Sequence, residues 1–173
     1  MEQSFVKENT RERERLISLV ERLTDEELNL PMGDDWTIAI ALAHLAFWDQ
    51  RSLFLVRKWE KTGQVEFSPI DIDVTNDCLL PLWRALDPRV AANLAVSSAK
   101  EVDQELEETP QDLISKIEGI GEKNRVYRSV HRKMHIDQIE DLLKNGVFLT
   151  KQNVLLILRS IFKALLTKLC VWR

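Results

Sequence analysis

Apolar residues recur at helical spacing along most of the chain, and no segment alternates apolar and polar residues over a useful length. Long stretches of this kind run from Glu2 to Leu23, from Ile38 to Lys61, from Pro88 to Glu108 and from Lys123 to Lys144. The pattern therefore predicts an all-α protein. Four long helices with connections of varied length favour a four-helix bundle.

Capping and breaking residues mark the predicted ends of these helices. The segment Thr24–Glu27 has the capping-box pattern and predicts a short helix after the first long one. Thr37 is placed to cap the second long helix, and Gly63 is placed to end it. Asp87-Pro88 has the pattern of an N-cap followed by the first helical residue, so the third long helix is expected to begin there.

Shorter helices are expected in two places. One is predicted to begin at Asn76 or Asp77, and another to follow Thr109-Pro110 and run to Glu118. The last long helix is expected to stop at Asn145-Gly146.

Composition adds limits on function. The 173 residues suit one domain, and a net charge of −4 lacks the basic footprint of a general nucleic-acid-binding protein. Cys78 and Cys170 lie far apart in the sequence and form no CxxC motif, so we expect reduced thiols in a cytoplasmic protein.

Charge divides the chain near Gly146. Residues 144–173 contain six basic residues and no acidic one, which leaves a net charge of −10 on residues 1–143. We therefore expect a bundle domain over residues 1–145 and a basic, apolar C-terminal extension over residues 146–173, predicted to be an extra helix. The apolar run 154–172 is long enough to span a bilayer, but three basic residues within it disfavour spanning. Three interpretations stay open for the extension: a fifth packed helix, a surface that binds a membrane or a partner, or a translation artefact.

The chain contains three histidines, and their positions suggest a metal site. His131 and His135 are four residues apart on a predicted helix, so their rings project from the same face. His44 is the only polar side chain in the apolar run 38–48, IAIALAHLAFW, which reads as a buried helix. A buried imidazole needs a hydrogen-bond partner or a metal. A structural role in the core remains the alternative, and Arg132 excludes the HExxH motif of zinc proteases.

Three stretches of the sequence resemble the DinB-like superfamily. These are residues 34–63 and 71–88 together with HRKMHIDQIEDLL at 131–143, and the resemblance extends over about residues 5–145. The superfamily includes the amino-terminal domain of mycothiol-dependent maleylpyruvate isomerase and bacillithiol-transferase-like proteins. The resemblance implies a four-helix bundle with up-down-down-up topology.

The resemblance also implies a site. It makes His44, His131 and His135 the ligands of a divalent metal ion, expected to be zinc or nickel, with iron and manganese as further options. Three imidazoles leave a coordination position open for water or for a thiol. The function implied is a thiol-dependent transferase or isomerase acting on a small molecule, with a low-molecular-weight thiol as cofactor and a homodimer as a possible assembly. Metal-dependent hydrolysis and a non-catalytic, stress-related or binding bundle are the alternatives.

Several further residues are candidates for secondary roles. Trp48, one turn after His44, is expected to wall the site, and Gln138 to line it or to hold a ligand in place. Arg51 is expected to form a salt bridge or to meet an anionic substrate, and Asp49 to be solvated or to bind another helix. The charged run 11–22 is expected to form a solvated face, and Asp137 and Glu140 to be exposed. The predicted core face of the last helix is a stripe of Tyr127, His131, Met134, His135, Gln138 and Leu142.

Overall fold

A computed structural model describes residues 4–145 of the chain. The main helices are α1 (Ser4–Arg22), α3 (Ile38–Thr62), α5 (Pro88–Glu108) and a last helix that occupies residues 128–145 of the described part. The shorter elements are α2 (Asp25–Leu28), α4 (Ile72–Arg84), α6 (Gln111–Gly119), the 3-10 turn η1 (Lys123–Arg125) and an antiparallel hairpin of β1 (Pro31–Gly33) and β2 (Trp36–Thr37).

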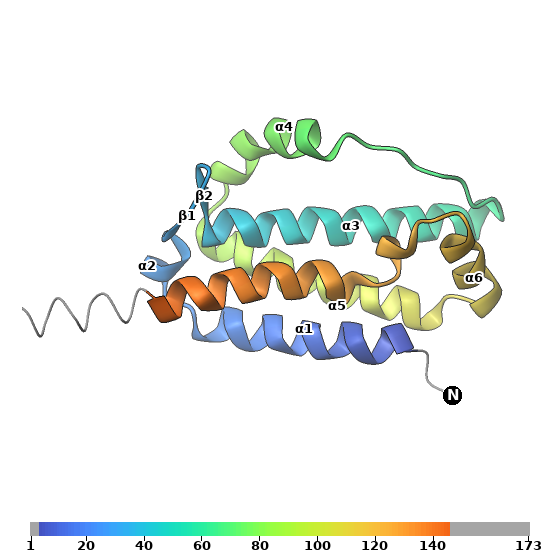
Figure 1. Cartoon of the computed structure of the whole chain (residues 1–173), viewed down its shortest axis with the longest axis horizontal. Helices are drawn as coiled ribbons and strands as arrows, with labels where there is room; N and C mark the ends of the chain where they lie inside the picture. The colour runs from blue at the N-terminus through green and yellow to red at the C-terminus, as the bar shows by residue number, and fades with distance from the viewer. Residues whose placement is uncertain (1–3, 146–173) are drawn as a thin grey trace, which may run out of the picture. The chain divides into compact units, whose positions relative to one another are not determined.

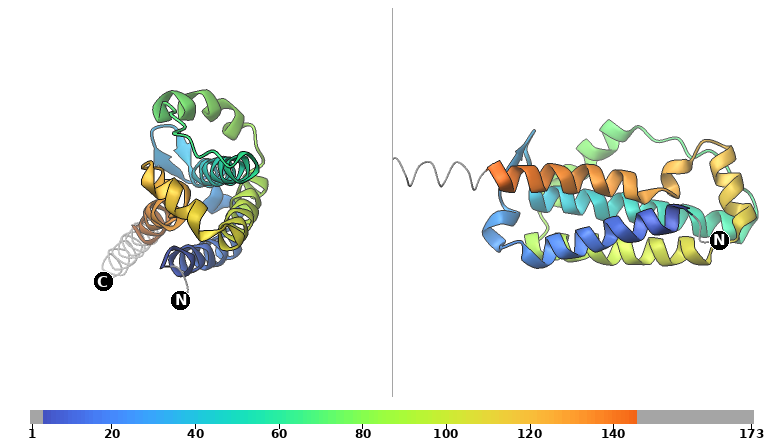
Figure 2. Two further views of the ribbon diagram at one scale, coloured as in Figure 1. Left: turned by 90° about the vertical axis from the view of Figure 1, so that its right-hand side faces the viewer. Right: turned by 60° about the horizontal axis from the view of Figure 1, so that its bottom comes forward.

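The described chain is an all-α bundle with the predicted topology. By its internal contacts the chain divides after Asp137, inside the last helix, and the residues up to Asp137 form one compact unit. α1 and the last helix run in one direction, and α3 and α5 run in the other (Figure 1). Because α3 and α5 are parallel neighbours, a long connection must return along the bundle, and this connection contains α4 (Figures 1 and 2).

Most of the predicted helix ends are confirmed. Thr24 forms the capping box with Glu27, with hydrogen bonds in both directions. The Thr37 hydroxyl accepts from the Ile40 amide at the start of α3. Gly63 ends that helix with φ 67°, a left-handed conformation that glycine adopts at little cost.

Two predicted helix starts are wrong. α4 begins at Ile72 rather than at Asn76 or Asp77, because the Asp71 carboxylate accepts from the Val74 amide and caps it earlier. The last helix begins at residue 128 rather than at Lys123, because the chain first forms the 3-10 turn η1. The hairpin before α3 was also not predicted from the sequence.

Small side chains bring α3 and α5 together. Both helices present buried alanines, four on each, which leave room for close backbone approach. These are Ala39, Ala41, Ala43 and Ala46 on α3, and Ala91, Ala92, Ala95 and Ala99 on α5. Larger apolar residues, among them Trp59 and Leu106, fill a core cluster toward the α6 end. The interface between α3 and α5 is therefore closely packed. This packing limits the directions in which the His44 side chain can extend from α3.

The charged run on α1 is not simply a solvated face. Glu12 is buried and pairs with Arg15, while Arg13 reaches Asp103 on α5. Asn9, one turn earlier, is also buried: its amide group donates to the Val126 carbonyl and accepts from the Ser129 amide. Asn9 therefore satisfies an amide in the first turn of the last helix, which would otherwise lack a partner.

The predicted extension at residues 146–173 lies outside the described residues. Among the described residues, no helix is long and apolar enough to cross a membrane.

Candidate metal centre

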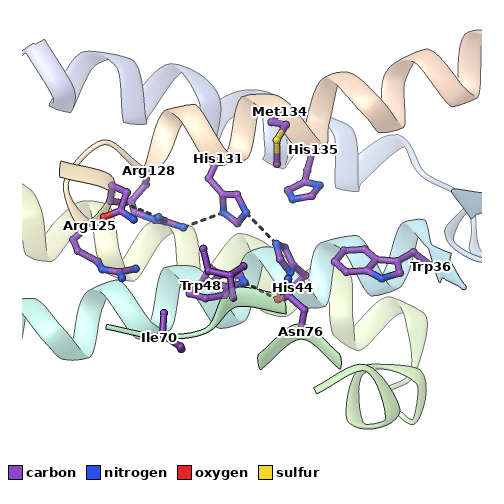
Figure 3. Close-up of a pocket in the computed structure, with 12 residues that line it drawn as sticks. Trp36, His44, Trp48, Ile70, Asn76, Arg125, Arg128, His131, Met134 and His135 are labelled. Carbon is purple, nitrogen blue, oxygen red and sulfur yellow. Dashed lines mark hydrogen bonds between the residues drawn. The ribbon is translucent and has the colours of Figure 1, made fainter. Parts of the chain in front are cut away.

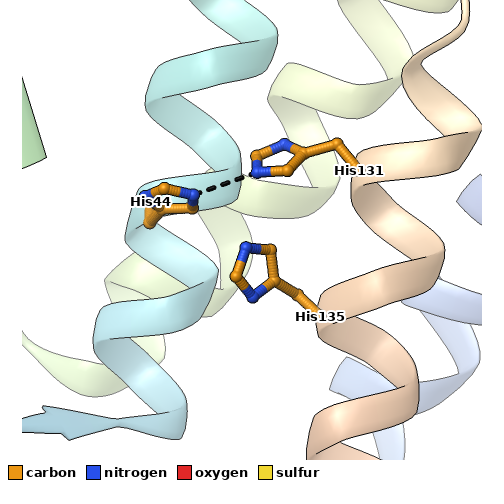
Figure 4. A group of neighbouring side chains, drawn as sticks. All are labelled: His44, His131 and His135. Carbon is orange, nitrogen blue, oxygen red and sulfur yellow. Dashed lines mark hydrogen bonds between the residues drawn. The ribbon is translucent and has the colours of Figure 1, made fainter. Parts of the chain in front are cut away.

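The three histidines lie together on the inner sides of two helices. His44 comes from α3, and His131 and His135 come from successive turns of the last helix (Figure 4). One ring nitrogen of each lies within 4.8 Å of the others, and the Nε2 atoms of His44 and His131 are 3.0 Å apart. His44 and His135 are buried, and His131 is half-buried. Residues 87 positions apart in the sequence thus form one cluster.

The histidines lie beside the core face of the last helix rather than at its centre. Arg132 and Ile136 are fully buried, whereas Met134 is 48% exposed and Gln138 is exposed. The predicted core stripe is therefore wrong by a rotation of the helix. Because an arginine occupies the centre of the real core face, hydrophobic periodicity alone pointed to the wrong side.

Burial keeps two of the imidazoles neutral. The pKa of His44 is lowered to about 3, first by burial and then by repulsion from His135 and Arg128. The pKa of His131 is lowered to about 2, again mainly by burial and next by Arg128. At neutral pH these rings are therefore uncharged, which is the protonation state that binds metals.

Arg128 contacts the cluster directly. Its Nη2 lies 3.1 Å from Nδ1 of His131, its Nη1 donates to the Asn124 carbonyl at 2.7 Å, and its Nε donates to Asp49 at 2.7 Å. A guanidinium has no acceptor, so Nδ1 of His131 accepts this hydrogen bond. All three groups of Arg128 are thus engaged, which holds His131 in one orientation.

A buried network of charged side chains holds Arg128 on the side away from His131. Asp49 accepts from both Arg128 and Arg132, and Arg132 forms two further bonds of 2.9 Å to Asp103 on α5. The Asp49 carboxylate and the Arg132 guanidinium are both fully buried. The network joins α3, α5 and the last helix immediately behind the histidines. Of the two roles expected for Asp49, the structure bears out the interhelical one.

A cavity of about 380 Å³ lies in front of the cluster (Figure 3). It is covered by α4 and the segment that precedes it, and the exposed side chains of Ile72 and Met134 lie at its rim. The residues that line it are Trp36, His44, Trp48, Ile70, Ile72, Asn76, Asn124, Arg125, Arg128, His131, Met134 and His135. The three imidazoles therefore face a space large enough for a small molecule and open to the surface.

The donor set fits a divalent transition metal in most respects. A tetrahedral site with metal–nitrogen bonds of about 2.0–2.1 Å places ligand nitrogens about 3.3 Å apart. The Nε2 atoms of His44 and His131 are 3.0 Å apart, and the candidate ligand nitrogens of all three rings lie within 4.8 Å of one another. The Nδ1 atom of His44 is buried and makes no aligned hydrogen bond among the described residues, although Asn76 lies close enough to oppose the lowering of its pKa. One feature works against ligation. Nδ1 of His131 accepts a hydrogen bond from Arg128, whereas a histidine bound to a metal usually donates a hydrogen bond from the ring nitrogen that does not bind the metal.

The other candidates from the sequence have mixed outcomes. Trp48 lines the cavity as predicted, and its indole N–H donates to Asn76 at 3.2 Å. Gln138 is exposed and does not line the cavity. Arg51 donates to the carbonyl and hydroxyl of Ser68 instead of forming a salt bridge. Asp137, expected to be exposed, is half-buried and pairs with Arg15.

Glu140 was also expected to be exposed and is half-buried. Four polar residues that line the cavity were not predicted from the sequence: Asn76, Asn124, Arg125 and Arg128. The apolar Ile70 and Ile72 were not predicted there either. The two arginines precede the HxxxH pair by one and two turns, and this spacing was the signal available in the sequence.

Fold and site together define a helical-bundle protein with three histidines close enough to hold a metal ion. The family model of the DinB superfamily matches residues 8–138, about three quarters of the chain, and the protein belongs to this superfamily. No curated protein and no solved structure matches the chain.

Proposed function

We propose that His44, His131 and His135 bind one divalent transition metal, with zinc and nickel as the first candidates. The protein would use this metal as a thiol-dependent transferase or isomerase for a small molecule. The observation that carries the proposal is the convergence of three imidazoles on the wall of a cavity that opens to the surface. A purely structural histidine cluster has no need of a cavity in front of it.

The chemistry follows from the ligand set. A metal bound by three neutral imidazoles keeps a position open and, when present, lowers the pKa of a thiol placed there. The protein's own residues do the remaining work. Trp36 and Trp48 provide apolar walls, and the hydrogen bond from Trp48 fixes the Asn76 amide at the edge of the space. Arg128 orients the ring of His131, although its hydrogen bond to Nδ1 opposes ligation through Nε2.

Metal content is the direct test. We expect about one equivalent of zinc or nickel per chain by plasma mass spectrometry after loading and desalting, and a loss of most of it in His44→Ala and in His135→Ala. Lys133→Ala is the matched control, since this lysine is exposed on the same helix and, within residues 4–145, pairs only with Asp137. Circular dichroism checks that each variant remains helical.

Cobalt separates the possible functions. In the cobalt-loaded protein, a thiol bound at the open position produces a sulfur-to-metal charge-transfer band. Appearance of this band on addition of 2-mercaptoethanol supports the thiol-dependent function. Metal binding without the band favours hydrolysis, and a failure of the folded protein to bind any of these metals favours a non-catalytic bundle.

A further inference from the structure

A second polar group faces the same cavity, at a distance along it from the histidines. Arg125 comes from η1, and Figure 3 shows its guanidinium directed into the cavity on the side of Trp48 away from Trp36. The side chain is only 5% exposed. Its Nε donates to Glu122 at 2.9 Å, and its two terminal nitrogens make no hydrogen bond among the described residues. A buried guanidinium with unused donors that face a cavity is suited to bind a ligand.

The surroundings of Arg125 carry unbalanced positive charge. Arg51 lies close enough to repel it, and burial together with this repulsion lowers the pKa of Arg125 to about 10. Glu122 is the one carboxylate that pairs with Arg125 among the described residues, and its other oxygen accepts from the Ser68 amide. Two guanidiniums therefore share one carboxylate, which leaves an excess of one positive charge.

Arg51 cannot relieve this excess. Its Nη1 atom is buried and makes no hydrogen bond in the part of the chain that the structure describes. Its Nη2 donates to uncharged oxygens of Ser68, and its guanidinium carbon lies 5.9 Å from the centre of the Trp48 ring. Arg51 is half-buried and Arg125 is buried, and the two share a single carboxylate, so the site favours the entry of an anion.

Arg128, the other arginine at the cavity, does not have this capacity. Its three groups are engaged with Asp49, Asn124 and His131, and Asp49 supplies its counter-charge. The excess charge therefore belongs to Arg125 and Arg51. Between Arg125 and the histidines, the cavity walls are largely apolar, with Trp48 and Ile70 among them.

We propose that Arg125 binds the carboxylate of a small, otherwise apolar acid whose other end reaches the three histidines. A single carboxylate matches the excess of one charge, and its two oxygens match the two free terminal nitrogens of the guanidinium. The apolar walls accept the body of the molecule. The binding of the carboxylate stands on its own, whereas the statement about its other end rests on the proposed function.

The test compares an acid with its uncharged analogue. We would titrate the metal-free, full-length protein with 3-phenylpropionate and with 3-phenylpropanamide by isothermal calorimetry. A charged hydrogen-bonded pair typically contributes enough to favour the acid about tenfold or more. Arg125→Met is expected to bind the acid and the amide equally, with its affinity for the amide unchanged.

Two further variants complete the design. Arg57→Met is the matched control: this arginine lies on α3, is half exposed, pairs with Glu105 and does not line the cavity. It should keep the preference for the acid. Arg125→Lys keeps the positive charge and should keep part of the preference, and circular dichroism verifies that each variant is folded.

The outcomes are distinct. Equal binding of the acid and the amide by the unaltered protein, or binding of neither, overturns the proposal without any use of variants. A preference that persists in folded Arg125→Met also overturns it, and tighter binding of phenyl phosphate than of the acid overturns the choice of carboxylate. Because the metal-free protein is used, these results do not depend on metal uptake. A failed carboxylate test therefore leaves the proposed metal site intact, and a failed metal test leaves the carboxylate site intact.

Discussion

Arg128 donates to Nδ1 of His131 over 3.1 Å, while Nε2 of the same ring faces Nε2 of His44 over 3.0 Å. Since the guanidinium can only donate, the neutral ring of His131 carries its proton on Nε2 and directs it at His44. A histidine that binds a metal through Nε2 carries the proton on Nδ1 instead. His131 must therefore move its proton from Nε2 and give up the hydrogen bond from Arg128 before it can bind a metal through Nε2.

Replacement of Arg128 should strengthen metal binding. In Arg128→Gln, the contact that competes for His131 and a positive charge beside the cluster are both removed, so we expect the affinity for zinc to rise by about five- to tenfold, or roughly 1 kcal/mol. Competition with a chromophoric chelator measures this affinity. Arg57→Gln, on the exposed side of α3, is the control and should leave it unchanged. Unchanged zinc binding by folded Arg128→Gln would show that Arg128 does not compete for His131, and weaker binding would show that it supports ligation.

The network behind the histidines should dominate stability. Arg132→Met leaves two buried carboxylates, Asp49 and Asp103, with fewer partners, and the loss of one member of a buried ion pair costs about 3–5 kcal/mol. Arg132→Lys should recover only part of this loss, because an ammonium group cannot reproduce the forked bonds to Asp103.

Urea unfolding measures these differences. Lys133→Met, one residue away and exposed, removes a solvent-screened surface pair with Asp137 and should lower the stability far less than Arg132→Met. If Arg132→Met were no less stable than Lys133→Met, the network would contribute nothing net to the free energy of folding.

Local signals in the sequence were enough to predict most of the fold. Thr24, Thr37 and Gly63 each act within a few residues of their own position, so their effect can be judged from neighbouring sequence. The start of α4 was missed because Asp71 was not recognised as its cap. The last helix starts after the 3-10 turn η1, and Asn9 of α1, 120 positions away, accepts from the Ser129 amide in its first turn, a contact that no local pattern contains.

Some residues of the site could be predicted from local sequence, and others could not. The three histidines were found because histidine is rare in this chain and because the spacing of His131 and His135 has a direct geometric meaning. Arg128 and Arg125 were missed because a charged residue on a predicted helix is expected to be solvated. Arg128 is buried against Asp49, which comes from α3, and Arg125 pairs with its near neighbour Glu122, whose other oxygen accepts from the distant Ser68 amide. The buried charge pairs between distant segments, rather than the helices, were what the sequence did not predict.

Acid should destabilise the metal-free protein before its carboxylates are protonated. An imidazole of the unfolded chain takes up a proton near pH 6.5, whereas His44 and His131 in the folded protein stay neutral until about pH 3 and about pH 2. Between these limits the unfolded state binds more protons than the folded state. The free energy of unfolding therefore falls as the pH falls, by up to about 1.4 kcal/mol per pH unit for each histidine.

Urea unfolding at pH 7 and at pH 5, in the presence of a chelator, isolates this effect from most carboxylate titration. The double variant His44→Gln/His131→Gln lacks both imidazoles, so its stability should fall less between the two pH values than that of the unaltered protein. Equal losses in the two proteins would mean that the folded state accepts protons at these rings as readily as the unfolded chain does. In that case the rings would not be held neutral by burial, and protons would compete with a metal for them already at mildly acidic pH.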